Sequence, residues 1–175
     1  AWKNKFFLVE FVGNPSRSHV WAFSLRPKGA SFELGEDIDA VSGILPTGIK
    51  FGPDGALYIA DWINGWDAKN YGRVWKLDVS DDKNDLKDIR IETQRLMQLD
   101  YSSQSDEELF TLLSYSDMRI RQKSQFELAK RHKKGWEIFK KAVSQENNQL
   151  ARIHAIWGIG QLARQPILVA GGVPE

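Results

Sequence analysis

The side chains best suited to chemistry lie between residues 61 and 73, where carboxylate, indole and guanidinium groups follow a short apolar segment. These residues are Asp61, Trp62, Trp66, Asp67 and Arg73. A loop at a strand end can present such groups together, and an indole face flanked by polar groups suits a polar ligand. The sequence therefore offers a substrate-binding site here. The favoured alternative is structural, with Arg73 pairing with Asp61 or Asp67 to hold the local fold together.

The histidines give only weak candidates for catalysis. His19, with Arg17 beside it, sits where a turn enters a strand, so it could act as a base, although a surface histidine at a strand end is the favoured interpretation. His132 lies in a basic run at an expected helix end, and His154 is flanked by apolar residues. No nucleophile elbow, phosphate loop or metal-ligand set is present, so the catalytic residues stay unassigned and this segment alone is not expected to complete a catalytic cycle.

Composition excludes several classes of protein. The chain of 175 residues is 42% hydrophobic and 27% charged, which is typical of a soluble folded protein, and it contains no apolar run near the roughly 18 residues of a membrane helix. Residues 1–100 carry 13 basic against 15 acidic side chains and residues 101–175 carry 11 against 8, so we expect no nucleic-acid partner. Without cysteine, this segment has no disulfide, zinc–thiolate site or covalently attached haem.

The first half of the chain is patterned as two antiparallel meanders. Short apolar segments with turn residues between them predict strands over residues 6–12, 19–25, 30–34, 48–51, 56–62 and 72–79. Gly52-Pro53-Asp54-Gly55 predicts a hairpin turn, with Gly55 supplying the positive φ. Such meanders are expected within the blades of a β-propeller.

Residues 77–88 form an expected connector between the two halves. Its four aspartates are interpreted as a solvated segment in preference to a calcium site, because a calcium loop needs tighter ligand spacing and a well-placed glycine. They are Asp81, Asp82, Asp85 and Asp88. Residues 89–92 could add the outer strand of the last blade, after which the pattern changes.

The second half has the period of helices. Ser105 with Glu108 is a capping box, and Asp117 is the expected cap of a second helix over residues 118–132. Further helices are expected over residues 135–144 and 148–164, ending before Pro166. Two segments align at an offset of about 31 residues, the size of a stacked helical repeat. The aligned residues are Arg121, Ser124 and Leu128 with Arg152, Ala155 and Ile159. The pattern predicts a short α-solenoid of HEAT-like helical pairs.

Several motifs together carry a family resemblance that covers residues 1 to about 165. They are Leu45-Pro46-Thr47, the Gly52–Gly55 turn, Asp61-Trp62 and Gly72-Arg73, followed by the helical pairs. The chain resembles the glucose/sorbosone dehydrogenase-like β-propellers, and most of all the large membrane-bound dehydrogenases of planctomycetes, in which HEAT-like repeats follow the propeller. It departs from them at Gly48, where the family commonly has Asp.

The resemblance implies a multi-domain protein, β then α, with the C-terminal blades of a propeller in residues 1–98 and HEAT-like repeats in residues 99–175. It implies a fragment of a quinoprotein-like sugar or alcohol dehydrogenase in a periplasmic or other extracytoplasmic location. Pyrroloquinoline quinone and calcium would serve as cofactors, with haem c in a domain outside this segment, and the repeats would hold that domain or a protein partner. The alternative is a non-catalytic module that binds a protein or a ligand.

Overall fold

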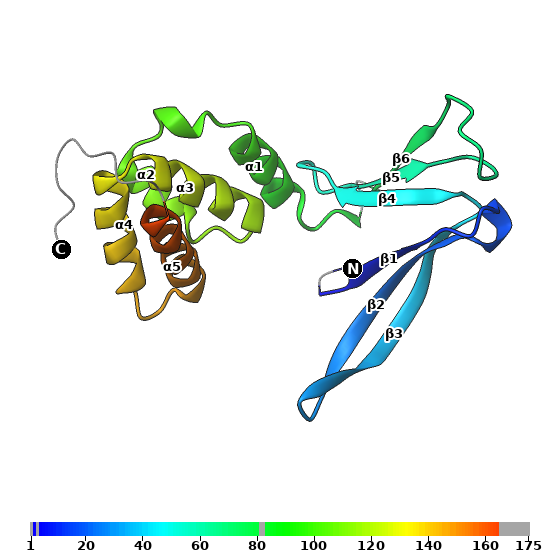
Figure 1. The fold of residues 1–175 in the computed structure, drawn as a ribbon, viewed down its shortest axis with the longest axis horizontal. Coiled ribbons are helices and arrows are strands. Elements are labelled where there is room, and N and C mark those ends of the chain that lie inside the picture. The colour runs from blue at the N-terminus through cyan, green and yellow to red at the C-terminus, as the bar shows by residue number, and fades with distance from the viewer. Residues whose placement is uncertain (1, 3, 81–82, 165–175) are drawn as a thin grey trace. The chain divides into compact units, whose positions relative to one another are not determined.

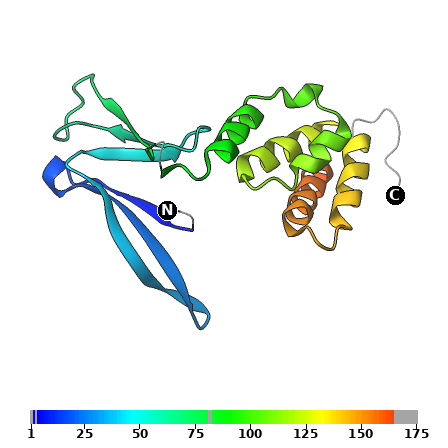
Figure 2. The same cartoon turned by 180° about the vertical axis from the view of Figure 1, so that it is seen from behind.

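The computed structural model describes residues 2, 4–80 and 83–164, which form two compact units. We call Ala1–Arg90 the β unit and Ile91–Glu175 the helical unit, and each is described by itself. Figures 1 and 2 show the strands of the first and the helices of the second. The connector residues Asp81 and Asp82 and the predicted helix stop at Pro166 lie outside the described residues.

The first sheet of the β unit is antiparallel, in the order β1-β2-β3. Its strands are β1 (Phe6–Glu10), β2 (His19–Lys28) and β3 (Ser31–Ser42). Phe6 pairs with Phe23, and Glu10 pairs with His19. The β2–β3 pairing continues to Lys28 and Ser31, so these strands extend beyond β1 as a two-stranded ribbon (Figure 1). The predicted hairpin is therefore longer than its sequence pattern indicated.

The second sheet is also antiparallel, in the order β4-β5-β6. Its strands are β4 (Pro46–Phe51), β5 (Leu57–Asp61) and β6 (Arg73–Leu77). The predicted turn joins β4 to β5: the Gly55 amide donates to the Gly52 carbonyl over 3.1 Å, and Gly55 has a φ of +77°. The expectation that Gly55 adopts positive φ is confirmed. This hairpin places Asp61 at the far end of β5.

The core of the β unit draws on both of its sheets. Val20 of the first sheet and Leu57 and Ile59 of the second are buried in one cluster. Partly buried residues around them are Trp2, Phe7, Val41, Ile44, Ile49 and Leu77. Because side chains alternate across a strand, the face of β2 that carries Val20 is turned away from the face that carries His19 and Trp21.

The helices of the helical unit begin largely where the sequence predicts. They are α2 (Asp106–Leu112), α3 (Met118–Lys130), α4 (Lys133–Val143) and α5 (Gln149–Ala163). A further helix that the sequence did not predict, α1 (Lys87–Met97), begins in the last residues of the β unit and continues into the helical unit. The Ser105–Glu108 capping box is present in full. Asp117 caps α3 and Asn148 caps α5. These side chains satisfy amides that the first turn of a helix leaves free.

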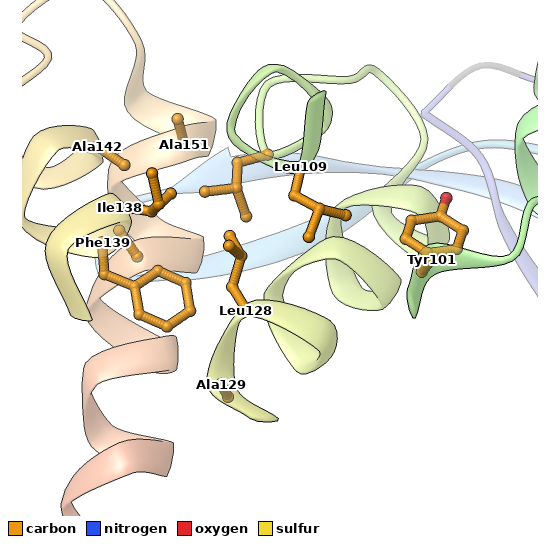
Figure 3. Packing of buried hydrophobic residues seen from close by; sticks show 10 residues of the cluster. Tyr101, Leu109, Leu128, Ala129, Ile138, Phe139, Ala142 and Ala151 are labelled. Atoms are coloured by element: carbon orange, nitrogen blue, oxygen red, sulfur yellow. The ribbon is translucent and has the colours of Figure 1, made fainter. Parts of the chain in front are cut away.

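One apolar cluster holds α2, α3, α4 and α5 together (Figure 3). Leu109, Leu128 and Phe139 are fully buried in it. Gly158 of α5 packs against the Phe139 ring so closely that a Cβ at position 158 would overlap it. The absence of a side chain at Gly158 therefore lets α5 approach α4.

The predicted fold class is wrong. The described residues form two small three-stranded antiparallel sheets and five helices, not a propeller, and the helices are not shown to form a solenoid. Residues 89–92, expected as an outer strand, lie in α1, where Glu92 pairs with Arg95 over 2.7 Å one turn later and Thr93 and Leu96 are buried. Local meander and capping signals fix hairpins and helices, but they do not fix how many strands a sheet gathers or how helices stack.

Candidate functional site

Asp61 is the centre of the predicted site, and its carboxylate is fully buried. Oδ1 accepts hydrogen bonds from the amides of Leu45 and Ile63 over 3.0 and 2.8 Å. Oδ2 accepts from the Trp75 indole Nε1 over 2.9 Å and lies 3.3 Å from Nε of Arg73. Asp61 therefore ties the start of β4, the loop after β5 and strand β6 together.

The protonation of Asp61 follows from these partners. Burial alone would raise the pKa of Asp61, but the hydrogen bonds from Trp75, Ile63 and Leu45, with the charge of Arg73, outweigh it and lower that pKa. The carboxylate is thus ionised at neutral pH with its lone pairs occupied. Asp61 is a structural anchor with no lone pair aimed at a ligand.

Arg73 takes the structural role that was the favoured interpretation of the sequence. Of the two predicted acidic partners it pairs with Asp61, and its guanidinium lies 5.2 Å from the centre of the Trp75 ring. Asp67 is exposed and has no hydrogen bond or ion pair within residues 2, 4–80 and 83–164. The five predicted residues are therefore divided between an anchor (Asp61 and Arg73) and an exposed loop.

The loop leaves β5 through a strained turn at Ile63. Ile63 has a φ of +79°, and the Asn64 amide donates to the Trp62 carbonyl over 3.1 Å, which closes a three-residue γ-turn. A β-branched residue at positive φ is a true outlier that costs roughly 1–3 kcal/mol and persists only where its surroundings enforce it. The bond from the Ile63 amide to Asp61 helps to hold this conformation, and the amide of Trp62, just before the turn, donates to the Leu45 carbonyl over 2.8 Å.

Two of the predicted residues, Trp62 and Trp66, line a cleft of about 440 Å³ within the β unit. The other lining residues are Val9, Phe11, Pro46 and Thr47. The Phe11 and Trp66 rings meet edge to face, 4.9 Å between centroids. Trp66 is nonetheless 70% exposed, so most of its indole faces solvent. The volume is in the range of small-molecule sites.

Gly13 makes the position of Trp66 possible. Gly13 has a φ of +73°, and a Cβ added there would overlap the Trp66 indole. The sequence placed Phe11 in the predicted strand over residues 6–12, which Gly13 directly follows. Neither was predicted to join the site, because both lie about fifty residues from Trp66 and no local spacing links them.

His19 lies away from this cleft. Its Nδ1 is 3.0 Å from Oδ2 of Asp39, and its ring lies against Trp21, whose indole donates to Glu10 over 2.8 Å. Val9 lines the cleft and pairs with Val20, whereas Glu10 pairs with His19, so the two sets lie on opposite faces of the first sheet. Arg17 is exposed in the 3₁₀ turn η1 (Pro15–Arg17). A single ligand in the cleft could not reach His19.

No cluster of metal-ligating side chains marks a calcium site in the part of the chain that the structure describes. Within residues 2, 4–80 and 83–164, no three His, Asp or Glu side chains are grouped closely enough to hold a metal ion. The same part of the chain contains no helix long and apolar enough to cross a membrane.

The β unit is thus an antiparallel two-sheet structure with an aromatic cleft held beside a buried carboxylate anchor. Comparison with known proteins adds no identity: no protein family, curated protein or solved structure matches the chain.

Proposed function

We propose that the β unit is a non-catalytic ligand-binding module whose cleft stacks a neutral sugar ring against Trp66 and Trp62. The observation that carries the proposal is the exposed Trp66 indole, supported from behind by Phe11 and Gly13. One face of a sugar ring is made of C–H groups and packs on an indole, while its hydroxyls need hydrogen-bonding groups at the rim. Thr47 and the unpaired carboxylate of Asp67 are candidates for that rim.

The charge of the cleft favours a neutral ligand. The residues that line it carry no lysine, arginine or histidine, so an anionic ligand such as a phosphate would lose its hydration without gaining a cation. The strain at Ile63 also supports a binding role, because strained backbone tends to be kept where it positions a functional group. Ile63 directly follows Trp62, which lines the cleft.

Oxidation of a sugar or alcohol is a second proposal, which rests on the family resemblance. The His19–Asp39 pair supports it, because a carboxylate that holds one ring nitrogen leaves the other available as a base. Because the His19–Asp39 pair lies on the face of the sheet opposite the cleft, we place the binding function first. Reduction of an acceptor dye with an aldose or alcohol by a longer protein that contains this chain, with quinone and calcium supplied, would establish the oxidoreductase. No reduction across a broad substrate panel would favour binding alone.

Calorimetric titration of the full chain with a panel of neutral mono- and oligosaccharides tests the binding function. We expect a saccharide with a Kd on the order of 1 mM or tighter. Trp66→Ala should weaken it about tenfold, which corresponds to about 1.4 kcal/mol. Gly13→Ala should also weaken it by displacing the indole.

Trp136→Ala is the matched control, because Trp136 is an exposed tryptophan in α4 of the helical unit. It should change the Kd by less than about twofold, or about 0.4 kcal/mol. No saccharide binding, or equal losses in Trp66→Ala and Trp136→Ala, would refute the proposal.

A further inference from the structure

A second, separate groove lies in the helical unit between α3 and α5. It has a volume of about 260 Å³, and its main lining residues are Gln122, Phe126, Ile156, Trp157, Gln161 and Arg164. Three of these are large apolar side chains that stay substantially exposed: Phe126 (46%), Ile156 (58%) and Trp157 (53%). The His154 ring meets Trp157 edge on, 5.1 Å between centroids, and so supports the indole from within the unit.

A directed chain of hydrogen bonds forms the polar floor of this groove. Buried His154 places Nδ1 2.7 Å from Oε1 of Gln125, and Gln125 Nε2 donates to Oε1 of Gln161 over 2.7 Å. Because the carboxamide oxygens of both glutamines are used as acceptors, the Gln161 NH₂ group is left as a donor at the groove. The floor therefore presents N–H groups, which suit an acceptor on the ligand.

The charge of the groove also favours a ligand that carries an acceptor, in particular an anionic one. Elsewhere in the described helical unit, Arg95, Arg119 and Arg131 each pair with a carboxylate. Arg164 lines the groove and has no ion pair within the described residues. No acidic side chain lines the groove. An anionic ligand in the groove would therefore meet the Gln161 NH₂ group and the unpaired guanidinium of Arg164.

We propose that this groove binds a short acidic segment of a partner protein, in which a carboxylate lies next to a large apolar side chain. The carboxylate would accept from Arg164 and from Gln161, and the apolar side chain would pack between Phe126 and Trp157. The apolar walls disfavour a bare inorganic anion, and a single arginine is too few cations for a nucleic-acid footprint. This inference is independent of the sugar cleft.

Fluorescence anisotropy with the full chain tests the groove. The probes are fluorescein-labelled octapeptides with Glu next to Leu or Phe, compared with peptides in which Gln replaces Glu or Ser replaces the apolar residue. Arg164→Glu and Trp157→Ala should each weaken the best acidic peptide about tenfold or more. Lys134→Glu is the matched control for charge, because Lys134 is exposed on α4 away from the groove residues, and it should leave binding within about twofold.

Each other outcome overturns the proposal. Equal weakening by Arg164→Glu and Lys134→Glu would mean nonspecific attraction, and equal binding of the Gln peptide would remove the carboxylate from recognition. Displacement of the peptide by inorganic phosphate, at a phosphate concentration close to the Kd of the peptide, would indicate a simple anion site. Failure of every acidic peptide to bind, with the circular dichroism of the variants unchanged, would exclude the groove as a peptide site.

Discussion

Replacing the buried carboxylate of Asp61 by an amide tests whether this residue anchors the site. In Asp61→Asn the remaining oxygen can still accept from Leu45 and Ile63, whereas the new NH₂ group at the second position faces the indole N–H of Trp75. Two donors then meet in a site without solvent. The charge that attracts Arg73 is lost as well.

The magnitude follows from the bonds that are lost. A hydrogen bond to a charged group contributes about 1.5–3 kcal/mol, and the pair with half-exposed Arg73 adds at most about 1 kcal/mol. We therefore expect Asp61→Asn to lower the opening free energy of this region by about 2–4 kcal/mol, which accelerates amide exchange roughly thirtyfold or more. The effect should be local, because Asp61 contacts the start of β4, the loop after β5 and β6.

Hydrogen exchange of the full chain, read by mass spectrometry on peptides covering residues 45–63, measures this opening. Asp67→Asn is the matched control. Because Asp67 is exposed, this substitution should leave the exchange of residues 45–63 unchanged. In a Trp75→Phe background the cost of Asp61→Asn should fall by about 1 kcal/mol, because the opposing donor is gone. A change below about 0.5 kcal/mol for Asp61→Asn alone would refute the anchoring role.

The lowered pKa of Asp61 gives the same anchor a pH dependence. A carboxylate whose pKa is lower in the folded state contributes stability above its unfolded pKa, about 3.9, and this is lost as the pH falls through the folded value. Exchange from residues 45–63, corrected for the intrinsic rate, should therefore accelerate below about pH 4. Asp61→Asn should lack that part of the acid response.

Two further substitutions test the backbone and the helical packing, each by thermal unfolding of the full chain. Ile63→Gly should raise the stability of the β unit by about 0.5–1 kcal/mol, because relief of the positive φ exceeds the entropy that glycine adds to the unfolded chain. Its control, Ile38→Gly in extended β3, should lower the stability. A loss of stability at both sites would show that the turn is unstrained. Gly158→Ala should lower the stability of the helical unit by about 1–3 kcal/mol, because the added Cβ overlaps Phe139. Its control, Gly160→Ala, has its nearest neighbour 3.6 Å away and should raise the stability by up to about 1 kcal/mol through helix propensity. Equal effects of the two substitutions would contradict the close packing at Gly158.

Sequence patterns predicted the local elements well. Alternating apolar residues located the strands, and turn chemistry at Gly55 and capping at Ser105 and Asp117 located hairpin and helix starts. Each of these signals acts within a few residues, so the chain itself carries the information. The same signals at residues 89–92 were ambiguous, and i,i+3 pairing with two buried positions made that segment a helix.

Long-range arrangement was beyond such patterns. Whether meanders join into a ring depends on contacts between residues far apart, and the resemblance to propellers was drawn from motifs that each describe one hairpin. The cleft shows the same limit, because Phe11 and Gly13 reach Trp66 only through folding. For Asp61 and Arg73 the sequence favoured a structural ion pair of Arg73 with Asp61 or Asp67, and only the buried hydrogen-bond network of Asp61 shows which carboxylate is the partner.

The most direct test of the central claim is an NMR titration of the tryptophan indole N–H groups with the panel of neutral saccharides. The chain has 7 tryptophans, so the indoles outside the cleft serve as internal references for those inside it. We predict saturable shifts confined to Trp62 and Trp66, with Trp136 and Trp157 of the helical unit unmoved. Absence of shifts across the panel, or uniform shifts of all indoles, would contradict a sugar-binding cleft in the β unit.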